Sequence, residues 1–145
     1  MSKKRCKLCG KYKDLDEFYP HKGYKGGLHA YCKHCCKVNR ALDKSSNYMR
    51  TWKRPSMQNT VRHEKRAQEY GVRFERGITP REIFRRDLGL CGICGEWVQP
   101  RHVSIDHKVP LSKGGTHTRD NVQLAHLKCN KIKGSSTDDA DADAS

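Results

Sequence analysis

Residues 91–133 read CGICGEWVQPRHVSIDHKVPLSKGGTHTRDNVQLAHLKCNKIK, and this stretch decides the fold of the C-terminal part of the chain. It begins with Cys91 and Cys94, and His126 and Cys129 repeat their spacing near its end. Two such pairs supply four ligands for one tetrahedral zinc ion, which would be structural because no coordination position stays open. The alternative is a surface thiol pair beside an exposed histidine.

Between the two ligand pairs, the pattern predicts a hairpin followed by a helix. Val103, Ile105 and Val109 alternate with polar residues, and a second short strand is expected at 121–124. The glycines of the intervening loop 112–116 permit a chain reversal. Residues 127–133 contain no helix breaker before Gly134, so the segment is expected to fold as strand, strand and helix.

Asp106 and His107 form the chemical centre of this segment. An imidazole can take a proton from water near neutral pH, and a carboxylate is a hard ligand for Mg²⁺ or Mn²⁺, to which Asn130 can add an oxygen. Neighbouring residues on a regular strand point to opposite faces. We therefore expect the strand to end or bulge at this pair, and Pro110 just downstream favours this.

The segment from Cys91 to Gly134 resembles the HNH endonuclease family, whose ββα-metal, treble-clef-like fold carries a DH…P…GG…N…C-N pattern. The resemblance implies that His107 is the general base and that Asn121 orients its imidazole through a hydrogen bond. It also implies that Asp106 and Asn130 hold the catalytic Mg²⁺ or Mn²⁺.

Two positions depart from the common family pattern. Asn130 stands where relatives often have histidine, which makes this an HNN variant, and His126 stands where many zinc-containing members have a third cysteine. Many compact proteins of this family are phage-borne, so a phage-type protein is expected. Lys133 is expected to contact phosphate.

The N-terminal part contains a second set of paired cysteines, Cys6 with Cys9 and Cys32 with Cys35. So short a segment buries little apolar surface and generally needs a metal or disulfides, and two such pairs favour zinc in a reducing compartment. It resembles a zinc-ribbon or treble-clef knuckle. Cys36 and His34 are alternative ligands to Cys35.

The composition indicates a polyanionic partner. The chain has 30 basic and 16 acidic residues, and four of the acids lie in the last eight positions, so the rest of the chain carries 30 basic against 12 acidic residues. The excess of positive charge creates an electric field that attracts nucleic acid, and this attraction weakens as the salt concentration rises. The expected phosphate contacts in the basic middle of the chain are Arg62, Lys65, Arg66, Arg73 and Arg76. A solvated charged face is the alternative.

We expect a small, zinc-stabilised α+β protein with four segments. These are a zinc-ribbon-like module at 1–40, a basic helical linker at 41–78, an HNH domain at 79–134 and a disordered acidic tail at 135–145. Within the linker, Pro55 separates a first helical stretch from a second at 57–70, whose Met57, Val61, Ala67 and Tyr70 form a thin apolar stripe.

A cap motif marks the start of the HNH domain. Thr79, Pro80 and Glu82 are the N-cap, first and third residues of a helix expected to reach Leu88. Its apolar residues Ile83, Phe84 and Leu88 are expected to pack on the hairpin module.

The leading functional prediction is a metal-dependent DNA endonuclease with two structural zinc ions and a catalytic Mg²⁺ or Mn²⁺. One site per chain favours nicking, in phage-type DNA processing, packaging or homing. The alternatives are a zinc-dependent nucleic-acid-binding protein without turnover and a nuclease of the Holliday-junction type. The chain shows no signal peptide or membrane-length apolar run, so the cytoplasm, that of the host if the protein is phage-encoded, is expected, with DNA and phage packaging or replication proteins as partners.

Overall fold

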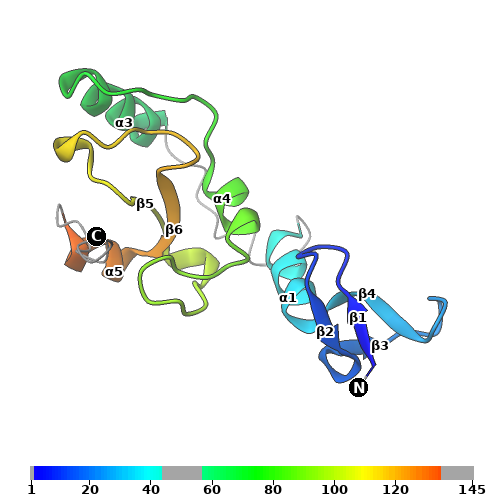
Figure 1. Ribbon diagram of the computed structural model, residues 1–145. Coiled ribbons are helices and arrows are strands. Elements are labelled where there is room, and N and C mark those ends of the chain that lie inside the picture. Colours follow the sequence, from blue (N-terminus) through cyan, green and yellow to red (C-terminus); the bar gives the residue numbers. More distant parts are fainter. Residues whose placement is uncertain (1, 44–56, 135–145) are drawn as a thin grey trace, which may run out of the picture. The chain divides into compact units, whose positions relative to one another are not determined.

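The computed structural model of the protein (Figure 1) describes residues 2–43 and 57–134. The chain divides into two compact units, Met1–Met49 and Arg50–Ser145. Pro55, the region around it and the acidic tail expected at 135–145 lie outside the described residues. The small mixed α and β elements confirm the expected α+β class.

The N-terminal unit consists of two short antiparallel hairpins and one helix. Strand β1 (Lys3–Arg5) pairs with β2 (Tyr12–Asp14), and after the 3-10 turn η1 (Leu15–Glu17), β3 (Phe18–Pro20) pairs with β4 (Leu28–Cys32). Helix α1 (Lys33–Leu42) begins directly after β4. Its core is small, because Phe18, Val38 and Leu42 are the large apolar side chains buried there beside the cysteines.

The C-terminal unit places two helices before the hairpin and one after it. In chain order its elements are α3 (Met57–Glu69), α4 (Pro80–Arg86), η2 (Pro100–His102), β5 (Val103–His107), η3 (Leu111–Lys113), β6 (Val122–His126) and α5 (Leu127–Lys133). The core forms where α4 packs on the hairpin, and its fully buried side chains are Ile83, Phe84, Val98, Val122 and Leu124.

Local sequence signals explain the start and the end of α4. The Thr79 hydroxyl accepts a hydrogen bond from the backbone N–H of Glu82 at 3.2 Å, as expected of an N-cap. The helix stops at Arg86, two residues before the expected end, because Leu88 and Gly89 have left-handed backbones with φ of 53° and 71°. A side chain at position 89 would also collide with the Trp97 ring.

Helix α3 forms where the sequence predicted it, but the predicted apolar stripe was wrong. Val61 and Tyr70 are exposed to 57% and 47%, whereas Ala67 is fully buried. His63 shares the inward face with Ala67, one helical turn away. The side chain of Met57 lies outside the described part of the chain.

The two strands of the hairpin pair in an unbroken antiparallel register from Val103 with His126 to His107 with Val122. The first strand ends at His107 without a bulge, so Asp106 and His107 occupy opposite faces of the ladder. Gly114 turns the following loop with a φ of 85°, and Gly115 lies so close to the backbone of Val109 that no side chain fits there.

Helix α5 spans Leu127–Lys133, as the sequence predicted, and is held to β5 by a buried ion pair. Lys133 Nζ donates to Asp106 Oδ2 at 2.8 Å and to the carbonyls of His107 and Lys108 at 2.9 and 3.1 Å. The side chains of Lys133 and Asp106 are only 2% and 4% exposed. The predicted contact of Lys133 with phosphate is therefore wrong, because its ammonium group lies inside the domain.

Replacing Lys133 with methionine should lower the free energy of unfolding by about 3–5 kcal/mol, because the Asp106 carboxylate would remain buried without its cation. Urea denaturation of the zinc-loaded protein measures this loss. Lys131→Met, at an exposed position of the same helix, is the matched control and should change stability little. Adding Asp106→Asn to Lys133→Met should restore part of the loss, and no recovery would contradict a charge-based cause.

Candidate active site and metal centres

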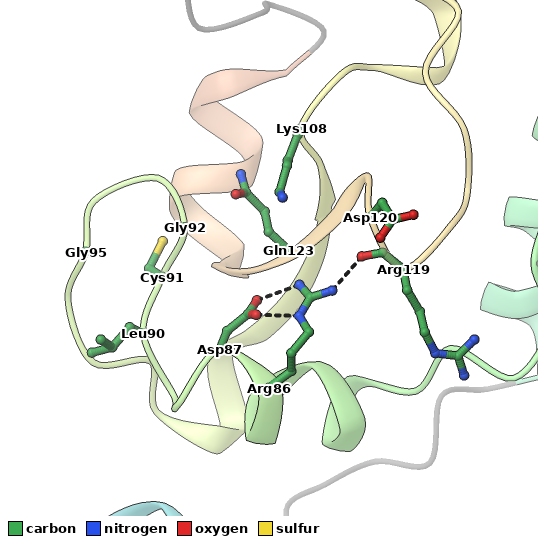
Figure 2. A pocket seen from close by; sticks show the side chains of 10 residues that line it. All are labelled: Arg86, Asp87, Leu90, Cys91, Gly92, Gly95, Lys108, Arg119, Asp120 and Gln123. Atoms are coloured by element: carbon green, nitrogen blue, oxygen red, sulfur yellow. Dashed lines mark hydrogen bonds and ion pairs between the residues drawn. The ribbon is translucent and has the colours of Figure 1, made fainter. Parts of the chain in front are cut away.

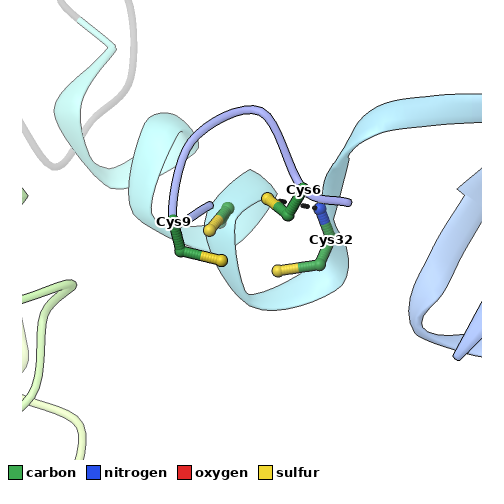
Figure 3. A group of neighbouring side chains, drawn as sticks. Cys6, Cys9 and Cys32 are labelled. Atoms are coloured by element: carbon green, nitrogen blue, oxygen red, sulfur yellow. Dashed lines mark hydrogen bonds between the residues drawn. The ribbon is translucent and has the colours of Figure 1, made fainter. Parts of the chain in front are cut away.

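Four cysteines of the N-terminal unit converge as the sequence predicted. The sulfurs of Cys6, Cys9, Cys32 and Cys35 all lie within 4.8 Å of one another (Figure 3). The neighbouring Cys36 instead directs its sulfur to His29 Nδ1 at 3.4 Å and to the Tyr31 carbonyl at 3.5 Å. The cluster therefore contains Cys35, and its four sulfurs fit a structural zinc ion.

The second expected cluster also forms, from Cys91, Cys94, His126 and Cys129. The Nδ1 atom of His126 lies 3.4 Å from the Cys94 sulfur and 3.7 Å from the Cys129 sulfur. Its other ring nitrogen, Nε2, lies 3.1 Å from the carbonyl oxygen of Trp97. A backbone carbonyl in this position fixes the proton on Nε2 and leaves the Nδ1 lone pair for zinc, so these four residues fit the ion.

The first cysteine pair of each cluster lies on the same kind of turn. We find no longer stretch of sequence that is repeated between the two units. In each, the glycine after the second cysteine has a left-handed backbone, with φ of 72° at Gly10 and 77° at Gly95. Each glycine N–H donates to the carbonyl of the first cysteine, at 3.0 Å to Cys6 and 2.8 Å to Cys91. In both units the second ligand pair lies at the start of a helix, α1 or α5.

These turns also prepare the first cysteine of each pair for metal binding. Burial alone would raise the pKa of the two thiols, but hydrogen bonds from backbone N–H groups outweigh it and lower the pKa of Cys6 to about 6 and that of Cys91 to about 7. The thiolate is the form that binds zinc, so each site contains one thiol that ionises readily near neutral pH.

We expect each of the two cysteine-containing clusters of the purified protein to hold one zinc ion. Cys6→Ser and Cys91→Ser should each remove one, because each breaks a different cluster. Cys36→Ser should leave the zinc content unchanged. Elemental analysis by mass spectrometry measures these contents, and loss of zinc from Cys36→Ser alone would contradict the ligand assignment.

Asp106 lies on the side of the hairpin that faces α5. Its Oδ2 accepts hydrogen bonds from Gln123 Nε2 and Lys133 Nζ, each at 2.8 Å. Asn130 lies on α5, and its amide nitrogen donates to Ser104 Oγ at 2.7 Å and to the carbonyl of Ile105, the residue before Asp106, at 3.2 Å. Asp106 in this arrangement does not fit a divalent cation, because an ammonium group already neutralises its carboxylate.

Asn121 fixes the loop between the two strands. Its amide nitrogen donates to the carbonyls of Val109 and Thr116 at 2.9 and 2.7 Å, and its Oδ1 accepts from the Val109 N–H at 2.9 Å. The expected hydrogen bond from Asn121 to the imidazole of His107 is thus replaced by bonds to the backbone. Asn121 therefore acts on His107 only indirectly, because it fixes the loop that follows the end of β5, where His107 lies.

The side chain of His107 belongs to a cluster of three histidines. Its Nε2 lies 2.9 Å from Nδ1 of His117, which follows the Gly-Gly loop, and its ring centroid is 5.6 Å from that of His63 on α3. One ring nitrogen from each of these histidines lies within 4.8 Å of the others. His107 therefore faces α3 and the loop, away from Asp106.

Their surroundings favour the neutral form of all three imidazoles. Burial is the main cause, and it lowers the pKa of His63 to about 4 and that of His107 to about 3, while that of His117 is also lowered. Repulsion from His117 and from Arg66 contributes at both His63 and His107. A neutral imidazole has a lone pair with which to accept a proton or bind a metal ion.

The lowered pKa values predict that acid destabilises the fold. The unfolded chain takes up a proton at each histidine near pH 6.5, but the folded protein does so only near pH 4 at His63 and near pH 3 at His107. The free energy of unfolding should therefore fall as the pH falls from about 6.5 towards 4. Urea denaturation at several pH values should show a shallower fall for His63→Gln, and equal slopes would contradict this cause.

The basic residues expected to contact phosphate are exposed around α3. Arg62, Lys65 and Arg66 lie on the helix, and Arg73 follows it. Arg76 is exposed as well and pairs with Glu64 at 2.6 Å. The structure thus leaves these side chains at the surface, and their contact with nucleic acid stays a prediction.

A shallow pocket on the same unit is also rich in charge. Arg86, Arg119 and Lys108 line it together with Asp87 and Gln123 (Figure 2). The Arg86 guanidinium is held by Asp87 and by the carbonyls of Arg119 and Val122, at 2.6, 2.5 and 2.7 Å. These bonds connect α4 to β6 and to the loop before it, so Arg86 is largely committed to the fold.

A hairpin and a helix joined by a cysteine and histidine cluster that fits zinc, with a histidine at the end of the first strand, define a domain of the ββα-metal type. Residues 91–136 match the family described as HNH endonuclease, so this third of the chain is similar to HNH endonuclease domains. Comparison with curated proteins gave no match. Among the residues that the structure describes, no helix has the length and apolar character needed to cross a bilayer.

The sequence did not point to His63 or His117 as site residues. The three histidines are far apart in the chain and share no ligand spacing, so only the fold brings them together. His117 lies two residues after the Gly-Gly loop, and this proximity to the family motif was the one local signal available.

Proposed function

We propose that the protein is a metal-dependent endonuclease that hydrolyses phosphodiester bonds in DNA, with His107 at its catalytic centre. The observation that supports this most is the position of His107 within the matched HNH domain, at the end of β5 and in its neutral form. A neutral imidazole can take the proton of an attacking water.

In this proposal His117 is a positioning residue for His107. The 2.9 Å contact between their ring nitrogens holds the His107 ring, and the proton that His107 gains can be shared across it. The negative charge of a bound phosphate would favour the imidazolium that burial now disfavours.

A divalent cation would neutralise charge on the scissile phosphate when bound. The sequence-based assignment of Mg²⁺ or Mn²⁺ to Asp106 and Asn130 requires Lys133 to release Asp106, because the two side chains form a buried pair. We therefore assign no step of the reaction to an ion at that position.

The exposed basic side chains around α3 supply the affinity for DNA in this proposal. The ring of His63, on α3, lies 5.6 Å from that of His107 between centroids, so a strand bound along α3 would pass near the imidazole. One histidine site per chain favours nicking over double-strand cleavage. A setting in phage DNA processing, packaging or homing within a host cytoplasm belongs to the same proposal.

A nucleic-acid-binding protein without turnover is the second candidate. The buried pair of Asp106 and Lys133 favours it, because it closes the position at which the family resemblance places the catalytic ion.

His107→Ala should abolish the nicking of supercoiled plasmid in Mg²⁺ or Mn²⁺, because it removes the only group placed to accept the proton of water in this proposal. Zinc content and DNA affinity should stay close to those of the unchanged protein. His107→Gln repeats the test with a side chain that fills more of the buried space. Gel electrophoresis of the plasmid with and without chelator measures cleavage.

His102→Ala is the control variant, since His102 is an exposed histidine next to β5. It should nick at an unchanged rate. Tight DNA binding without nicks by the unchanged protein would overturn the endonuclease and support the binding protein.

A further inference from the structure

Three histidines from separate parts of the C-terminal unit meet on the face of the hairpin opposite Asp106. His63 comes from α3, His107 from the end of β5 and His117 from the loop before β6. One ring nitrogen of each lies within 4.8 Å of the other two. None of the eight ligands of the two cysteine-containing clusters belongs to this group.

Several contacts hold the three rings in place. The His117 ring stacks on Phe74 with centroids 4.7 Å apart and on His63 with centroids 5.2 Å apart. Its backbone N–H donates to the Arg73 carbonyl at 2.9 Å, and its carbonyl accepts from the Glu75 N–H at 2.7 Å. These bonds bring the segment after α3 alongside the loop, so the site is largely formed before any ligand binds.

The polar atoms of the cluster are not fully satisfied by one another. Nδ1 of His63 is buried and has no hydrogen-bond partner among the described residues. A buried polar atom without a partner destabilises the fold, because it has lost its hydrogen bonds to water. A bound ion would offset this cost if the ring turned the free nitrogen toward it.

We infer that His63, His107 and His117 form a third metal site, which binds a divalent transition-metal ion. Two nitrogens bound to one such ion at about 2.0–2.1 Å stand about 3 Å apart, close to the 2.9 Å between His107 and His117. Three imidazoles without a carboxylate select Zn²⁺, Co²⁺ or Ni²⁺ over Mg²⁺, which prefers oxygen ligands. Three protein ligands also leave a coordination position open, unlike the two four-ligand clusters.

The site has a direct consequence for His107. Its lone pair either accepts a proton from water or binds the ion, so occupation of the site withdraws His107 from the role of base. Metal binding itself does not depend on the proposed nuclease function. The metal site is therefore tested by measuring metal binding, and this measurement decides the inference even if the protein does not cleave DNA.

Cobalt titration of the full-length protein, with both cysteine-containing sites filled with zinc, tests the inference. We expect one further equivalent of Co²⁺ to bind, with visible ligand-field absorption but without the near-ultraviolet sulfur-to-cobalt band that thiolate ligands produce. Mg²⁺ in large excess should not displace it. His63→Ala and His117→Gln should each weaken binding at least tenfold.

His102→Ala, which removes an exposed histidine outside the cluster, should bind Co²⁺ as the unchanged protein does. Far-ultraviolet circular dichroism and a retained content of two zinc ions show that each variant is folded. If His117→Gln is not folded by these criteria, the binding of Co²⁺ by His63→Ala alone tests the site. Absence of a third equivalent in the unchanged protein, or undiminished binding by the folded His63→Ala, would overturn the site.

Discussion

The arrangement of the C-terminal unit depends on the unbroken hydrogen-bonded ladder between β5 and β6. Because the ladder runs through the final pair, His107 with Val122, it sends the side chains of Asp106 and His107 to opposite faces. The Asp106 face packs against α5 through a buried ion pair, whereas the His107 face meets α3 and the loop. Adjacent residues are thereby separated: Asp106 holds the helix, and His107 is free for the role in chemistry that we propose.

Both units have small cores, and both bring four metal-ligand side chains together in the same structural arrangement. A cysteine turn closed by a left-handed glycine approaches the first turn of a helix, and four ligands converge between them. A zinc ion bound at that point would join segments that bury too little apolar surface to stay together by themselves. This explains how a chain with only 34% hydrophobic residues forms two folded units.

Features with local causes were predictable from the sequence, and features with distant causes were not. The paired cysteines, the Thr79 cap and α5 each follow from residues within one turn or loop. The inward position of Lys133 does not, because Lys131 has the same charge two residues earlier and is exposed. The histidine cluster likewise required the backbone pairing of His117 with the segment after α3, which no spacing in the chain reveals.

This pairing also changes the interpretation of α3. The sequence suggested a basic linker, but the helix contributes His63 to the cluster and buries Ala67, while Arg62, Lys65 and Arg66 face outward. In the proposed mechanism, one helix therefore attracts the DNA backbone on its outer face and borders the reactive imidazole on its inner face. Because the His63 ring on α3 lies 5.6 Å from that of His107, phosphate drawn to α3 would in this mechanism arrive at the face of the hairpin that Asp106 does not occupy. The candidate site on the hairpin thus includes a histidine from a helix outside the matched segment.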